Sequence, residues 1–194
     1  MTAQDTKEKV MAAAIKVFGQ KGFHGATTRE IAREAGVAEG TIFRHFKSKK
    51  DLLVSLATPM VVDSLIGLID EVSNRSDEEI IKAVINNRIK IIREHMGIVK
   101  LLIYESVFHP EVQEILYSNI ISKAKGVLEK FISQRIQQGR FKDVDPSHAA
   151  RCLAGMVFMM ILWENVGLDE SKGLTKDEKI TQLVDIFLHG MTKS

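Results

Sequence analysis

The sequence predicts an all-α protein, because helical periodicity runs through the chain and strand signals are almost absent. Apolar residues recur every three or four positions, and no stretch shows the sustained alternation of a half-buried strand. No Asn-Gly or Asp-Gly pair marks a hairpin turn. We expect about nine helices, arranged as an N-terminal three-helix helix-turn-helix domain followed by a larger helical domain.

Local signals set the ends of these helices. Thr27 and Glu30 have the spacing of a capping box, and Ser48 is a second N-cap candidate. Pro110 and Pro146 suit the first turn of a helix. The predicted helices cover residues 6–20, 28–35, 39–46, 48–73, 77–93, 95–108, 110–138, 146–165 and 176–191. We expect the first domain to span residues 1–50 and the second to span 51–194.

Charge and composition narrow the classes of partner. Residues 1–50 hold ten Lys/Arg against five Asp/Glu, so this segment either meets a polyanion or is a basic solvated face. Cys152 is the single cysteine, which excludes an intrachain disulfide and fits a cytoplasmic protein. The polar N-terminus does not have the pattern of a secretory signal. The longest apolar run, 153–163, is shorter than the ~20 residues of a membrane span, so no membrane partner is expected.

Residues 28–46 have the pattern of a helix-turn-helix, with Gly36 in the turn. Phe18 and Ile15 of the first helix are expected to form the floor of its core. The side chains expected to pack inside the motif are Ile31, Ala32, Ala35, Val37, Ile42 and Phe46. The third helix then presents Glu39, Gly40, Thr41, Arg44 and His45 outward. These side chains suit base edges and phosphates in a major groove, although a solvated helical hairpin remains the alternative.

Residues 9–53 resemble the N-terminal DNA-binding domain of TetR-family regulators. The resemblance rests on three patterns in this order: A-x-x-x-F-x-x-x-G-F, T-T-x-x-I-A-x-x-A-G-V and G-T-I-F-x-H-F-x-S-K-x-x-L. It implies a cytoplasmic homodimer that binds a palindromic DNA operator, most simply as a repressor released by a small, largely apolar effector. The residues placed at or near DNA are Thr28, Gly40, Thr41, Phe43, Arg44, His45, Lys47 and Lys49.

Phe43 departs from the family pattern, and Glu39 is an acidic residue among the outward side chains of the same helix. Many family members have Tyr where Phe43 stands, and Phe cannot donate that hydrogen bond to a phosphate. Phe43 therefore either packs on the sugar-phosphate backbone or faces inward. Glu39 either reads a cytosine amino group or stabilises the N-terminus of its own helix, and we favour the second interpretation.

The second domain is expected to bind the effector and to dimerise. Met and aromatic residues gather on the sixth and eighth helices, which suits either an apolar pocket or an ordinary core. The effector residues predicted from this set are Tyr104, Glu105, Phe108, Phe158 and Trp163. Met156, Met160, Leu183 and Phe187 repeat at helical spacing on the last two helices. They predict a four-helix dimer interface, with closure of the monomer core as the alternative.

Other function classes find little support. The sequence has no Walker loop, dinucleotide glycine motif, nucleophile elbow or HExxH motif, so an enzyme is not expected. A helical adaptor that docks a protein without DNA is the other rival. His148 and Cys152 lie four apart but have no third ligand nearby, so we expect neither a metal site nor a cofactor. Glu105 and His109, four apart on one helix face, either orient a ligand or form a surface pair, and we favour the second interpretation.

Overall fold

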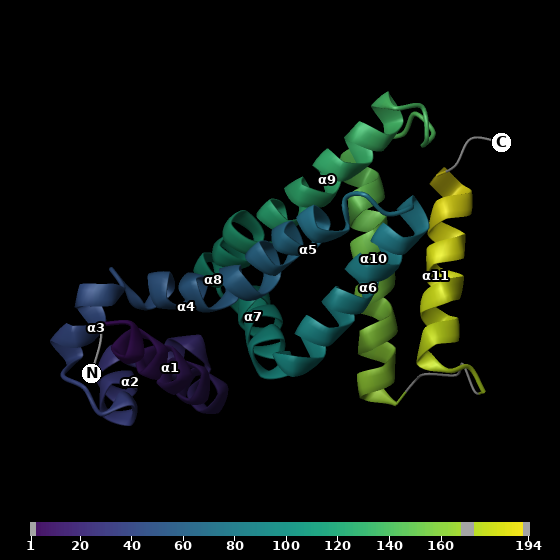
Figure 1. The fold of residues 1–194 in the computed structure, drawn as a ribbon. Coiled ribbons are helices and arrows are strands. Elements are labelled where there is room, and N and C mark those ends of the chain that lie inside the picture. The colour runs from purple at the N-terminus through teal and green to yellow at the C-terminus, as the bar shows by residue number, and fades with distance from the viewer. Residues whose placement is uncertain (1–2, 168–172, 192–194) are drawn as a thin grey trace. The chain divides into compact units, whose positions relative to one another are not determined.

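The computed structural model describes residues 3–167 and 173–191 (Figure 1). Within these ranges the chain is helical, with no β-strand, which confirms the predicted fold class. Eleven α-helices and two π-helical segments join into nine continuous helices across these ranges. Their bounds are α1 Ala3–Gly25, α2 Thr28–Ala35, α3 Glu39–His45, α4 Lys49–Thr58, η1 Pro59–Asp63, α5 Ser64–Val72, α6 Asp77–Glu94, α7 Met96–Phe108, α8 Pro110–Glu114, η2 Ile115–Ile121, α9 Ser122–Gln137, α10 Pro146–Val166 and α11 Lys176–Met191.

The chain forms two compact units. Unit 1 contains the residues up to Met60 together with His95–Ile121, and unit 2 contains Val61–Glu94 with the residues from Ser122 onward. In unit 1, helix α1 packs on α2, α3, α4 and α7, and α4 packs on η2. The predicted burial of Phe18 is confirmed, and Val10 and Ala14 share its buried face of α1.

The expected role of Ile15 is wrong. Its side chain is 41% exposed, whereas Val17 shares the buried face of α1 with Phe18. Successive residues of a helix are turned by about 100°, so a face that buries positions 10, 14, 17 and 18 points position 15 away from the core. Phe18 is thus part of the floor of the helix-turn-helix core and Ile15 is not.

Unit 2 is built on α6, which contacts α5, α10 and α11, while α9 packs along α10. Asp77 at the first residue of α6 accepts a hydrogen bond from Arg135 Nε at 2.7 Å and pairs with Arg140 Nη2 at 2.9 Å. Asp145 begins α10 as its N-cap, because its carboxylate accepts hydrogen bonds from the backbone of Ser147 and His148. These contacts fix the starts of α6 and α10.

The continuous helix Lys49–Val72 is long and apolar enough to cross a membrane by length and composition alone. The core helix of a soluble protein passes the same test, and seven of its residues are buried: Leu52, Leu53, Leu56, Ala57, Val62, Leu65 and Val72. Pro59 opens its π-helical segment, where the missing proline N–H disturbs the regular helical bonding. Arg88 donates to the Val61 carbonyl and to Ser64 Oγ beside this irregular turn, and burial lowers the pKa of Arg88 to about 10.

Gly22 interrupts α1, although helical turns resume as far as Gly25. Its φ of 73° and ψ of 172° lie in a region that glycine alone occupies readily. A Cβ at this position would also lie 2.4 Å from Glu105 Oε1 on α7. Gly22 therefore satisfies two separate requirements, the backbone turn and the close approach of a buried carboxylate.

Gly22→Ala is expected to destabilise the protein by roughly 1–3 kcal/mol, the cost of holding a non-glycine residue in such a conformation. Gly19→Ala is the matched control, because Gly19 lies in the same helix with open space around it and alanine favours a helix over glycine. Urea unfolding followed by circular dichroism would measure both. Equal midpoints for the two variants would contradict this account of Gly22.

Candidate nucleic-acid interface

Helix α2 begins at the predicted capping box, which is confirmed. Glu30 N donates to Thr27 Oγ1 at 3.2 Å, and Thr27 N donates to Glu30 Oε2 at 3.1 Å. Lys21 from α1 also pairs with Glu30. The hydrogen bond from Lys21, then those from Thr27, lower the pKa of Glu30 from 4.5 to about 2. The start of α2 is thus held both by its own cap and by α1.

The turn between α2 and α3 is closed by Gly36, whose φ of 67° lies in the left-handed region. Val37 N donates to Ala32 O at 3.0 Å, and Gly36 N donates to Arg33 O at 3.2 Å, which satisfies the last carbonyls of α2. Ile31, Ile42 and Phe46 are buried beneath this turn. The geometry is that of a helix-turn-helix.

Helix α3 presents the predicted outward residues. Gly40, Phe43 and Arg44 are exposed, and Thr41 and His45 are half-buried. Phe43 is 51% exposed, so the inward alternative for this side chain is excluded. Arg44 Nη2 donates to Thr41 Oγ1 at 2.9 Å across one turn of the helix, which fixes the orientation of the guanidinium. A Cβ atom at position 40 would have no neighbouring atom within 4 Å, so the space beside Gly40 is open.

Thr28 and Glu39 form a pair that the sequence did not reveal. Thr28 Oγ1 donates to Glu39 Oε1 at 2.6 Å, which links the first residue of α2 to the first residue of α3. Glu39 is the first residue of α3, and both interpretations of its carboxylate stay predictions. Thr28 would have to exchange this partner before its hydroxyl could donate to a phosphate.

Helix α4 starts at the predicted N-cap Ser48, whose side chain accepts from Asp51 N at 3.0 Å. Asp51 Oδ2 in turn accepts from Lys47 N at 2.8 Å, so the backbone of Lys47 is fixed while its side chain remains exposed. Arg44 in the last turn of α3 and Lys47 in the turn that follows are thus two exposed cations.

Lys49 has a structural role that the sequence did not predict. Its Nζ donates to Phe23 O at 2.6 Å and to Ala26 O at 2.8 Å, and it lies 4.6 Å from the centre of the Phe23 ring. Burial lowers the pKa of Lys49, and the charges of Glu105 and Glu111 oppose that shift. The contact of Lys49 with DNA stays a prediction, now for a side chain that already holds the end of α1.

The residues predicted to contact the effector are divided between the two units. Tyr104, Glu105 and Phe108 belong to unit 1, whereas Phe158 and Trp163 belong to unit 2. Glu105 is buried, and Tyr104, Phe108, Phe158 and Trp163 are among the exposed large apolar side chains. None of these five lines the groove of about 610 Å³ that lies between α5 and α9 in unit 2.

Two of the four predicted dimer residues are buried within the single chain. Leu183 is 8% exposed and Phe187 is 6% exposed, which favours the alternative that these two close the monomer core. Met156 and Met160 are half-buried. The exposed apolar side chains of the last two helices are instead Phe158, Met159, Leu162, Trp163 and Ile186.

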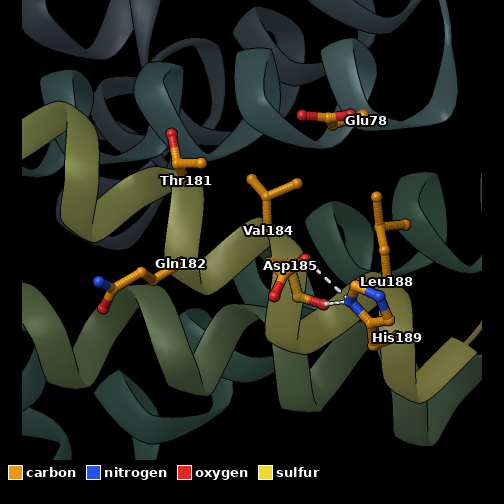
Figure 2. A pocket seen from close by; sticks show the side chains of 7 residues that line it. All are labelled: Glu78, Thr181, Gln182, Val184, Asp185, Leu188 and His189. Carbon is orange, nitrogen blue, oxygen red and sulfur yellow. Dashed lines mark hydrogen bonds and ion pairs between the residues drawn. The ribbon is translucent and has the colours of Figure 1, made fainter.

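A hollow of about 310 Å³ along α11 is lined mainly by polar side chains (Figure 2). His189 Nδ1 lies 2.8 Å from Asp185 Oδ1 one turn earlier, and both side chains are well exposed. An exposed pair of this kind contributes little and leaves no buried polar atom to hold a ligand. We assign this hollow no function.

Comparisons with known proteins agree with this geometry. The family model for bacterial regulatory proteins of the tetR family matches residues 10–56, and the model for the C-terminal domain of AefR-like transcriptional repressors matches residues 79–190. The second match covers more than half of the chain. The helix-turn-helix therefore belongs to a bacterial transcriptional regulator. The chain belongs to the TetR family.

Individual relatives show how far this likeness extends. The uncharacterized HTH-type transcriptional regulator YerO of Bacillus subtilis is 32% identical over 114 residues, which cover 57% of this chain and 39% of YerO. FadR of B. subtilis, solved with stearoyl-CoA, has a TM-score of 0.71 at 20% identity and covers 94% of this chain and 98% of FadR. NalD, the secondary repressor of the MexAB-OprM multidrug efflux pump in Pseudomonas aeruginosa, has a TM-score of 0.71 at 19% identity and full coverage of both chains. These two structures share the fold.

The capping network predicts an acid-dependent stability. Because folding lowers the pKa of Glu30 to about 2, the charged carboxylate stabilises the folded state above pH ~4.5, and this contribution is lost as the pH falls towards 2. Glu30→Gln should therefore be less stable than the wild type at neutral pH and approach it in acid. Glu34→Gln, which removes an exposed ion pair with Lys16 but no cap, is the control. Thermal melts between pH 2 and pH 7 would test this prediction. A difference in melting temperature between wild type and Glu30→Gln that does not change with pH would contradict it.

Proposed function

We propose that the protein is a cytoplasmic repressor that binds a palindromic DNA operator as a dimer. The observation that carries this proposal is the outward surface of α3, where exposed Arg44 and half-buried Thr41 lie beside Lys47 on a fixed helix-turn-helix. Two such helices on a symmetric dimer would enter major grooves about one DNA turn, ~34–36 Å, apart. We assign residues 1–50 to DNA binding and 51–194 to effector binding and dimerisation.

Contacts within the interface divide into two roles. Arg44 and Thr41 face outward from the middle of α3, which suits base edges, and Lys47 at the following turn suits a phosphate. Phe43 is exposed beside them and suits apolar contact with the sugar-phosphate backbone. Thr28, Gly40, His45 and Lys49 complete the proposed set.

The proposed dimer surface is the exposed apolar side of α10. Gly155, Phe158, Met159 and Leu162 follow the helical repeat of three and four, while Leu153 and Val157 are buried on another side of the same helix. A helix that is apolar nearly all round is typical of one covered on both sides. Because unit 2 covers only one side of α10, a second copy of the chain is the occupant that the family's dimers suggest. Met156 and Met160 flank this surface.

The proposed effector is small and largely apolar, and we place it in the groove between α5 and α9. Val62, Ile66, Ile69, Val127 and Phe131 supply an apolar lining, and Lys123 and Lys130 add positive charge. A volume of about 610 Å³ lies in the usual range for small-molecule sites. Such a groove suits an acyl chain with an anionic end, the class of ligand found in FadR. The sequence-based alternative places the ligand against Tyr104, Phe158 and Trp163.

Effector binding would lower the affinity for the operator by changing the separation of the two α3 helices. An allosteric coupling of this kind is typically ~1–3 kcal/mol between sites. The neighbouring NalD is a repressor by its description, which supports negative control as the mode of action.

DNA binding should respond differently to two substitutions. Lys47→Ala should weaken binding to all duplexes alike and reduce the slope of log affinity against log salt by about 1, because it removes one phosphate contact. Thr41→Ala should change the motif selected from random duplexes. Arg75→Ala, which removes an exposed charge between α5 and α6, is the control. An affinity for DNA that does not change with salt, and that is equal for operator and scrambled duplex, would contradict the proposal.

Dimerisation should be lost in Phe158→Glu and Leu162→Glu without loss of folding, because both side chains are exposed in the single chain but would place an unpaired charge in the proposed interface. Thr181→Glu adds the same charge at an exposed position of α11 and should remain dimeric. Phe187→Glu should instead unfold the chain, since Phe187 is buried. Sedimentation at micromolar concentration would decide, and a monomeric wild type would refute the proposed dimer.

Stearoyl-CoA is the probe that we would use for the effector. It should release the operator from the wild type, and Val127→Trp should block release by filling the groove while DNA binding remains intact. Phe158→Leu, a milder change at the dimer surface, should still respond. The emission of Trp163, the single tryptophan of the chain, would report a ligand at the alternative site. Unimpaired release in Val127→Trp would exclude the groove.

A further inference from the structure

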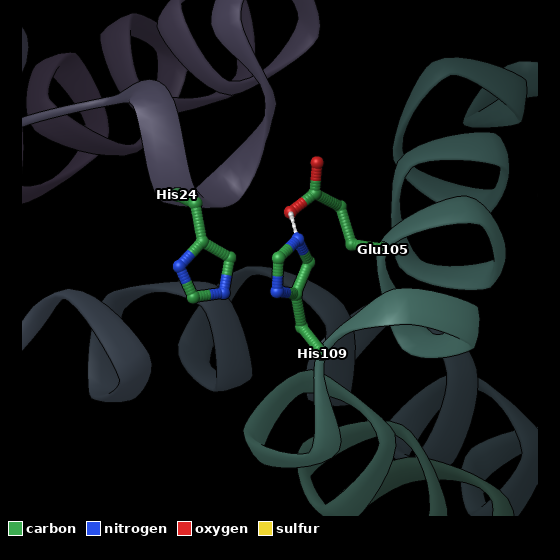
Figure 3. Close-up of side chains that lie close together, drawn as sticks. All are labelled: His24, Glu105 and His109. Atoms are coloured by element: carbon green, nitrogen blue, oxygen red, sulfur yellow. Dashed lines mark ion pairs between the residues drawn. The ribbon is translucent and has the colours of Figure 1, made fainter.

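Three side chains of metal-binding type meet in unit 1, where the end of α1 faces α7 and the start of α8 (Figure 3). His24 lies near the end of α1, Glu105 lies on α7, and His109 joins α7 to α8. One potential ligand atom from each residue lies within 4.8 Å of the other two. The cluster therefore brings together two imidazoles and a carboxylate from different parts of the chain.

Glu105 is the unusual member of the cluster. It is the one charged or polar residue that is buried among those the structure describes, with 8% of its surface exposed. Its Oε2 is buried and has no hydrogen-bond partner, and His109 Nε2 lies 3.9 Å away. A buried carboxylate oxygen without a donor is costly, and such atoms need an explanation. A cation between Glu105 and the two imidazoles would satisfy this oxygen.

The two imidazoles are held close together. Their ring centres lie 3.7 Å apart, so the two side chains already share one small volume. Glu111 Oε1 lies 2.8 Å from His24 Nε2 and orients that ring. A carboxylate beside a metal-binding histidine is a common supporting contact. With neutral imidazoles, Glu105 and Glu111 give this region two negative charges against the single positive charge of the nearby Lys49.

We infer that His24, Glu105 and His109 bind a divalent transition-metal ion of the zinc class. Two imidazole nitrogens and one carboxylate oxygen form a recognised zinc set, with an exchangeable fourth position. The nitrogen ligands select zinc-class ions over magnesium and calcium, which prefer oxygen. Side-chain rotations would bring the ligand atoms from their present separations to about 3.3 Å, the spacing around a tetrahedral zinc ion.

Sequence reasoning missed this site for a definite reason. Glu105 and His109 lie one helical turn apart and have the spacing of an ordinary surface pair. The third ligand, His24, is more than eighty positions earlier in the chain. Only the packing of α1 against α7 brings it to the pair.

An occupied site would tie the end of α1 to α7 and α8. Because α1 supports the helix-turn-helix, metal binding would stabilise unit 1 and restrict the movement of α1 relative to α7. The consequence for the operator rests on the proposed function. We infer that zinc changes the affinity of the protein for DNA by holding α1 in one position.

The site can be tested with zinc sulfate on the full-length protein after removal of metals by chelator. Calorimetric titration should give one zinc ion per chain, and zinc should raise the melting temperature of the wild type. His24→Ala and His109→Ala should bind zinc at least tenfold more weakly. His148→Ala is the matched control, because His148 is exposed on α10 and lies one turn before Cys152, the alternative metal pair. It should bind zinc as the wild type does.

Several outcomes would overturn the inference. A wild type that binds no zinc, or zinc binding that survives His24→Ala and is lost in His148→Ala, would exclude the cluster. His24 is partly exposed, so this variant should fold even if His109→Ala does not, and circular dichroism would check both. Operator binding that is normal in chelator, together with no zinc binding, would remove the metal site and leave the proposed DNA function standing. Bound zinc with equal operator affinity in zinc and in chelator would refute the regulatory consequence.

Discussion

The position of the proposed DNA-binding surface depends on one partly buried ammonium group. Lys49 Nζ donates to the carbonyls of Phe23 and Ala26, and so it joins the first residue of α4 to the end of α1. Helix α3 lies between α2 and α4 in the chain, and this contact fixes α4 while the Glu30 cap fixes α2. Without Lys49, the carbonyls at the end of α1 would lose a charged donor, and α4 would lose this side-chain connection to α1.

Gly22 allows the end of α1 to lie close to α7. Its positive φ ends the regular part of α1, and its missing Cβ leaves room for Glu105 of α7. The N-terminal helices are therefore held by α7 as well as by one another. A change at the end of α7 would reach α1 directly, through Glu105 and the neighbouring His109 and His24, rather than through the body of the helix-turn-helix.

The sequence predicted the parts of this structure that depend on neighbouring residues. The capping box at Thr27, the N-cap at Ser48 and the turn at Gly36 rest on local chemistry, and the structure confirms them, whereas α1 runs from Ala3 to Gly25, beyond the predicted residues 6–20 at both ends. The sequence did not predict contacts between residues far apart in the chain, such as Lys49 with Phe23 or His24 with His109. Helical spacing also cannot say which of two apolar sides faces the core. Ile15 was therefore placed inside, and Leu183 and Phe187 were assigned to an interface although both are buried in the monomer.

Hydroxyl-radical footprinting of the wild-type protein on a duplex selected from random sequence tests the central claim most directly. If the exposed side of α3 enters the major groove in a symmetric dimer, the footprint should show two protected segments with centres about 10–10.5 base pairs apart, or a whole multiple of that spacing. The sequence of one segment should be related to that of the other by two-fold symmetry. A single protected segment without symmetry, or uniform protection that does not depend on sequence, would contradict the account.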